Sequence, residues 1–178
     1  MSFGWGFAEA TLFFLLPDIV VGAVALLHWR RGLRAAGAAI GGAVLGGVCL
    51  YAATVMWPGT VGTALDAVPL IPDRFFIRAH EAVSQQGGWA IVSGPSEGVP
   101  YKLYVYEWAR SGLGAVSLAL WTVPARAVRI LGTVLIAAVA GAVLRRWFGA
   151  RREPALLAVY VLCWCAVYVA YVSAVGLS

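Results

Sequence analysis

Six charged side chains stand inside or beside long apolar runs: Glu9, Asp18, Glu97, Lys102, Arg126 and Arg129. Insertion scales put the cost of one charge at the centre of a bilayer at about 2.5 to 3.5 kcal/mol, so Glu9, Asp18, Glu97 and Lys102 are expected to face one another, water or a ligand. The three carboxylates suit proton binding, because desolvation favours the neutral form of a carboxyl group. The three cations suit a phosphate group. The set therefore predicts proton-coupled handling of an anionic lipid.

Each of these residues also has a simpler structural interpretation. Glu9 would then lie at the membrane interface, and Asp18 would cap a helix N-terminus. Lys102 would extend its ammonium group to the lipid headgroups. Arg126 and Arg129 would anchor a helix end at the interface. A further pair, three residues apart, would interact on a helix surface: Glu107 and Arg110.

The composition indicates an integral membrane protein. Of 178 residues, 62% are hydrophobic and only 12% are charged, whereas soluble domains carry about 25% charged residues. The net charge of +5 comes from basic residues near the ends of apolar runs, which is typical of membrane orientation and not of nucleic-acid binding. Three cysteines lie in apolar stretches without zinc spacing, and no nucleotide or nucleophile motif is present. The sequence therefore predicts neither an enzyme, nor a cofactor, nor a metal site.

Three segments are expected to cross a bilayer as helices of about 20 apolar residues: 35–57, 127–144 and 155–177. Two further apolar segments, 3–28 and 87–123, are interrupted by prolines and charges. The expected helix breaks are Pro17, Pro95 and Pro100, because proline removes a helical hydrogen bond and clashes with the preceding turn. Each half is then too short to cross a core of roughly 30 Å, so we expect re-entrant hairpins packed against protein.

These elements predict an all-α integral membrane protein in a single domain. Two re-entrant helical hairpins would form an inverted repeat, accompanied by three or four transmembrane helices. The predicted parts are a first hairpin with its transmembrane helix at 1–57, an interfacial connector at 58–86 containing an amphipathic helix near 73–84, a second hairpin with its helix at 87–147, and a C-terminal transmembrane helix at 154–177.

Arginines predict the orientation of these helices. Two clusters, 30–34 and 145–152, are expected on the same, cytoplasmic side. Twelve of the 13 basic residues are Arg, which together with the abundant Ala, Gly and Val suggests a GC-rich bacterial genome and hence a bacterial plasma membrane. Glycines at four-residue spacing within 37–47 predict close helix packing. We expect this packing inside the chain, and a homo-oligomer is the alternative.

Three stretches resemble the DedA family, also called SNARE-associated or VTT-domain membrane proteins, and within it the YqaA-like branch. They are E-A-T-L-F-F-L-L-P-D at 9–18, the glycine-rich helix at 37–51, and G-P-S-E-G-V-P-Y-K at 94–102, with Arg126 and Arg129 following. The resemblance covers roughly residues 4–145. It implies two opposed re-entrant hairpins and the movement of lipids across a bilayer. For bacterial members the lipid is a polyprenyl phosphate such as undecaprenyl phosphate, and movement is often linked to the proton motive force.

Under this resemblance, Glu9 and Asp18 look like the family's acidic pair in the first hairpin. The second hairpin departs from the family, because Glu97 and Lys102 stand where typical members carry two arginines. We therefore expect a flippase for an anionic lipid, with proton coupling at Glu9, Asp18 and Glu97 and phosphate binding at Lys102, Arg126 and Arg129. A non-transporting membrane scaffold or assembly factor, or else a lipid-modifying membrane enzyme, is the alternative.

Overall fold

The computed structural model describes residues 2–11, 18–68, 71–94, 98–148 and 153–176, and within these residues it is helical without a strand. The helices are, in chain order, α1 (Ser2–Thr11), α2 (Asp18–Leu27), α3 (Trp29–Met56), α4 (Pro58–Asp66), α5 (Asp73–Gln86), α6 (Trp89–Ser93), α7 (Tyr101–Arg110), α8 (Ala115–Phe148) and α9 (Glu153–Gly176). The predicted all-α class is thus confirmed for the described part of the chain.

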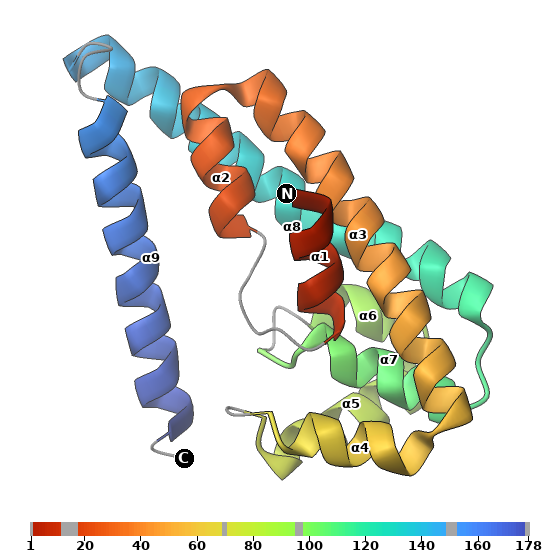
Figure 1. Cartoon of the computed structure of the whole chain (residues 1–178). Coiled ribbons are helices and arrows are strands. Elements are labelled where there is room, and N and C mark those ends of the chain that lie inside the picture. The colour runs from red at the N-terminus through yellow and green to blue at the C-terminus, as the bar shows by residue number, and fades with distance from the viewer. Residues whose placement is uncertain (1, 12–17, 69–70, 95–97, 149–152, 177–178) are drawn as a thin grey trace.

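Two long helices, α3 and α8, form the frame of the molecule and pack against each other (Figure 1). Both are apolar and long enough to cross a membrane, since 28 and 34 residues rise about 42 and 51 Å at 1.5 Å per residue. The predicted helix 127–144 is too short, because α8 begins at Ala115 and continues through Pro124. One proline removes only one backbone hydrogen bond, and α8 also packs against α3 and α6.

The first interrupted segment forms two ten-residue helices, α1 and α2. The chain reverses direction between them, so that α2 runs opposite to α3 (Figure 1). Both helices pack on α3 rather than extensively on each other. The expected break at Pro17 lies outside the described residues.

Glycines of α3 allow α1 to lie directly on its backbone. A Cβ on Gly42 would overlap the carbonyl oxygen of Phe3, and a Cβ on Gly46 would lie 2.7 Å from the carbonyl oxygen of Phe7. Both glycines are buried, whereas Gly37, on another face of α3, is exposed with nothing near its Cβ position. The prediction that these glycines pack elements of one chain is confirmed for Gly42 and Gly46.

The end of α8 meets the junction between α2 and α3. Arg145 donates hydrogen bonds to the carbonyl oxygens of Leu26 and Leu27, at 2.6 and 3.1 Å. Close packing continues along this contact, because a Cβ on Gly141 would overlap the Leu26 carbonyl oxygen. The start of α3 and the end of α8, which carry the two arginine clusters, therefore lie at the same end of the molecule (Figure 1).

The connector ends on an amphipathic helix, α5, whose buried side chains Phe75, Ala79 and Val83 recur at four-residue spacing and pack against α7 and α6. This confirms the helix predicted near 73–84. The connector also contains α4, which begins at Pro58 immediately after α3 ends. Proline suits the first helical position because that position needs no N–H donor.

The second interrupted segment forms α6, of only five residues, and α7, of ten. Residues 101–109 of α7 are all buried, so this helix lies inside the bundle. Pro100 precedes α7 in an extended conformation (φ −62°, ψ 134°), which confirms a break at this residue. Pro95 and Glu97 lie outside the described residues.

The C-terminal helix α9 stands beside the rest of the molecule and contacts α2 and α8 (Figure 1). It has 24 residues and carries no charged side chain after Glu153. Within the described residues, two helices, α3 and α8, meet the length and hydropathy criteria for a membrane span. Apolar side chains of α8 and α9 are exposed over most of their length, among them Leu120, Leu135, Ile136, Leu162 and Val169. Exposed apolar surface on this scale marks contact with a membrane or with another protein.

Candidate functional site

Four helices bring five charged side chains into the interior: Glu9 on α1, Asp18 on α2, Lys102 on α7, and Arg126 and Arg129 on α8. The central contact joins Arg126 Nη2 to Glu9 Oε2 at 2.8 Å, with a second approach of 3.1 Å from Nη1 to Oε1. The Arg126 side chain is only 2% exposed. A charge taken so far from water requires an opposite charge beside it, and Glu9 supplies it because α1 lies on α3 at Gly42 and Gly46.

Arg129, one helical turn beyond Arg126, pairs with the second carboxylate. Its Nη2 atom is 3.1 Å from Asp18 Oδ2 and 4.0 Å from Glu9 Oε1. Thr133, a further turn along α8, shares its single hydroxyl hydrogen between Asp18 Oδ1 and the Arg129 carbonyl oxygen, each at 3.2 Å. Spacings of three and four residues place Arg126, Arg129 and Thr133 on one face of α8, and that face is directed at α1 and α2.

Tyr101 supports Arg126 from α7. The Arg126 guanidinium carbon lies 4.2 Å from the centre of the Tyr101 ring, a cation–π arrangement that strengthens where water is excluded. Thr122 donates its hydroxyl hydrogen to the Leu118 carbonyl oxygen. The Tyr101 hydroxyl therefore donates to Thr122 Oγ1, at 2.6 Å, since a threonine hydroxyl has one hydrogen. This hydrogen bond fixes the ring that contacts the guanidinium.

Lys102 adds the third cation. Its side chain is 3% exposed and interacts electrostatically with Glu9. It follows Pro100 by two residues, so it lies in the first turn of α7, where the helix dipole also favours an anion. Burial excludes the alternative that Lys102 extends to the surface, and the burial of Arg126 likewise excludes a role as an exposed anchor.

The cluster retains hydrogen-bond donors that no described residue uses. Its described side chains are two carboxylates and three cations. Within the described residues, Nε of Arg126 and Nε of Arg129 are buried without a hydrogen-bond partner. Buried donors of charged groups are rarely left unpaired in proteins, so the geometry suits an anion with several acceptor oxygens.

Five of the six predicted charged residues therefore lie in one cluster, with Glu97 outside the described residues. Which predicted proton site pairs with which predicted phosphate ligand was not anticipated. Sequence reasoning also missed the uncharged partners Tyr101, Thr122 and Thr133. Their one sequence signal is spacing, since Thr122 and Thr133 lie four residues from Arg126 and Arg129 on α8, and Tyr101 adjoins Lys102.

A second buried charge lies at the other end of α7. Glu107 accepts from Arg110 at 3.4 Å, which confirms the predicted pair, but its side chain is buried (4% exposed) and does not lie on a helix surface. His80 on α5 approaches Glu107 Oε2 with its Nδ1 atom at 3.0 Å. A pocket of about 460 Å³, also lined by Asp66 and Asp73, opens beside them. We interpret the contact as one that holds α5 on α7.

Within the described ranges, the His, Cys, Asp and Glu side chains form no group of three that would hold a metal ion. Comparison with protein-family models, curated protein sequences and solved structures finds no match for the chain. The functional interpretation therefore rests on the geometry of the charge cluster.

Proposed function

We propose that this chain is a multi-pass protein of the bacterial plasma membrane that moves an anionic lipid between leaflets, in the manner of the DedA family that its sequence resembles. The observation that carries the proposal is the cluster of Glu9, Asp18, Lys102, Arg126 and Arg129, buried between two long apolar helices and retaining unpaired guanidinium donors. A role in packing alone would leave these buried donors without a purpose.

The substrate class follows from the charges. A phosphate monoester offers several acceptor oxygens and a negative charge, which match arginine N–H groups and a lysine. The apolar exterior would keep the lipid chain in hydrocarbon while the headgroup occupies the cluster. We propose polyprenyl phosphate, with undecaprenyl phosphate as the expected bacterial example.

Proton coupling would use the two carboxylates. Each is paired with an arginine, and a phosphate arriving at the arginines would compete for the same N–H donors. A carboxylate released from its arginine in a water-excluded site would take up a proton, because desolvation disfavours its charged form. Substrate entry and proton binding would thus be linked through Arg126 and Arg129.

The topology belongs to the same proposal. The orders α1–α2–α3 and α6–α7–α8 both place two short helices before a long one, which supports an inverted repeat. The two interrupted segments would be re-entrant, meeting near the midplane where broken helices form transporter sites.

The test is lipid translocation in proteoliposomes containing the purified full chain and labelled polyprenyl phosphate, with and without a pH gradient. Protein-dependent movement is expected for the wild type and is expected to be lost in Lys102→Ala. Asp18→Asn should lose the response to the gradient, whereas Glu81→Gln, which neutralises an exposed carboxylate on α5, should behave as wild type. No movement of this lipid or of common phospholipids would overturn the proposal in favour of a scaffold.

A further inference from the structure

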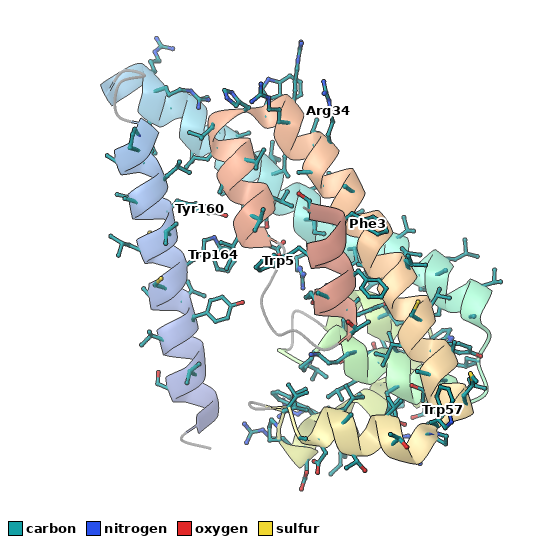
Figure 2. The ribbon with its side chains drawn as sticks, in the orientation of Figure 1. Phe3, Trp5, Arg34, Trp57, Tyr160 and Trp164 are labelled. Carbon is teal, nitrogen blue, oxygen red and sulfur yellow. The ribbon has the colours of Figure 1, made fainter. Side chains whose placement is uncertain are left out.

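One face of α9 carries aromatic side chains at four-residue intervals: Tyr160, Trp164 and Tyr168. Neighbouring rings lie 6.4 and 6.5 Å apart between centroids. These three side chains are partly covered, whereas Leu162 and Val169 beside them are exposed. Trp164 points from α9 toward the side on which α1 and α2 lie (Figure 2).

The upper end of this aromatic face is fixed to the charge cluster. The Tyr160 hydroxyl donates to the backbone carbonyl oxygen of Asp18 at 3.2 Å. The approach requires a glycine on α2, because a Cβ on Gly22 would overlap the Tyr160 hydroxyl oxygen. The aromatic face therefore begins at the backbone of Asp18, a residue of the cluster, and continues along α9.

Tyr168, two turns further along, interacts electrostatically with Arg129. Arg129 is also the cation of the cluster that retains exposure, at 28% of its side chain, compared with 2% for Arg126. Arg129, whose side chain is partly exposed although its Nε and Nη2 atoms are buried, is thus an arginine of the cluster that interacts with the aromatic side chains of α9.

We propose that the anionic lipid enters the cluster from the side of α9, with its phosphate at Arg129 and the first part of its hydrocarbon chain along Trp164 and Tyr168. This inference rests on the proposed function. Aromatic rings offer a large apolar contact area, and tyrosine and tryptophan also tolerate a polar neighbour, which suits the junction between a phosphate and its chain. Charge favours a lipid anion over a second copy of this protein, since a copy docked symmetrically on this face would bring two arginine-rich clusters together.

The experiment maps where a photoreactive polyprenyl phosphate, carrying a diazirine in its first isoprene unit, labels the full chain in liposomes. Labelled residues are identified by peptide mass spectrometry. We expect labelling at Trp164 and Tyr168 that excess unlabelled polyprenyl phosphate removes and excess phosphatidylcholine does not. Labelling spread evenly around α9, labelling insensitive to polyprenyl phosphate, or a cross-linked dimer through this face would overturn the inference.

Two matched variants separate recognition from general lipid contact. Trp164→Ala is expected to reduce the competed labelling and the initial rate of translocation by about fivefold, the ratio given by roughly 1 kcal/mol of lost aromatic contact. Leu162→Ala, on the outward face of the same helix, should change neither the competed labelling nor the initial rate of translocation. Trp164→Phe keeps an aromatic ring and should retain most of the labelling and most of the rate. Equal effects of Trp164→Ala and Leu162→Ala would overturn the inference.

The inference and the proposed function fail in different ways. If the wild type moves the lipid while Trp164→Ala moves it equally well, the α9 route is wrong and the transport function stands. If the wild type is labelled specifically at Trp164 but moves no lipid, the binding face stands and the transport function is wrong.

Discussion

Arg126 and Glu9 are 117 residues apart in the sequence, yet their side chains meet at 2.8 Å in the interior. The pair links α8 to α1. The position of α1 on α3 depends on a separate contact, the close backbone packing at Gly42 and Gly46. The same two residues are the predicted phosphate ligand and the predicted proton carrier, so one contact has both a structural and a functional interpretation. The two can be separated by experiment.

Glu9→Gln is expected to lower the free energy of unfolding by about 3 to 5 kcal/mol, because removing one partner of a buried ion pair leaves the other charge uncompensated. SDS titration of the purified protein in mixed micelles measures this loss. The double variant Glu9→Gln with Arg126→Met should recover most of the stability, since it removes both charges, but it should not recover lipid movement. Recovery of movement in the double variant would show that the pair serves the fold alone.

Lys102→Met is expected to slow translocation of polyprenyl phosphate by about 10- to 100-fold, the ratio given by one charged hydrogen bond of roughly 1.5 to 3 kcal/mol. Lys102→Arg keeps the positive charge and should retain most of the rate. The initial rate in proteoliposomes is the measurement. Similar rates for the Met and Arg variants would contradict a role for this charge in binding phosphate.

Gly42→Ala is expected to destabilise the protein by about 1 to 3 kcal/mol, the usual cost of overpacking, because the added methyl group would overlap the Phe3 carbonyl oxygen. Gly37→Ala provides the matched control on the same helix, where nothing lies within 4 Å of the new atom. It should stabilise by up to about 1 kcal/mol through helix propensity. The same SDS titration measures the free energy of unfolding of both variants. Equal changes in this free energy would contradict the observed packing.

Arg145→Ala is expected to lower the free energy of unfolding by about 1 to 2 kcal/mol, because the guanidinium donates to two terminal carbonyl oxygens of α2. Arg146→Ala removes the same charge one residue later, from an exposed side chain, and should change stability little. The comparison separates the hydrogen bonds from the general effect of one positive charge. Comparable losses would show that charge at this end of the molecule matters more than the contact.

Local features were readable from the sequence, and partnerships between distant segments were not. Pro58 and Pro100 fix the starts of α4 and α7 through backbone chemistry, and the spacing of Phe75, Ala79 and Val83 predicts α5. The start of α8 was missed because Pro124 interrupts the pattern, whereas the helix continues through it and packs against α3 and α6.

The candidate site shows the same division. The cost of burying charge identified Glu9, Asp18 and Lys102, and Arg126 and Arg129 were added as cations suited to the same phosphate. Which carboxylate faces which arginine depends on how α1 and α2 stack along α3, and a single sequence does not carry that information. Tyr101 and Tyr160 were missed for a related reason, since a tyrosine in an apolar helix looks alike whether its hydroxyl meets a partner or the lipid.

The proposed topology makes one prediction about sidedness, which single cysteines test after the exposed Cys49, Cys163 and Cys165 are replaced by Ala. If α3 and α8 cross and the second interrupted segment is re-entrant, cysteines at Gly59 and Gly114 react with a membrane-impermeant thiol reagent from one side. Cysteines at Arg34 and Arg146 then react from the other. A full crossing by residues 87–111 would place Gly59 and Gly114 on opposite sides, and Arg34 and Arg146 as well. That arrangement conflicts with the hydrogen bonds from Arg145 to the end of α2, so opposite labelling of Arg34 and Arg146 would refute both the re-entrant segment and this contact.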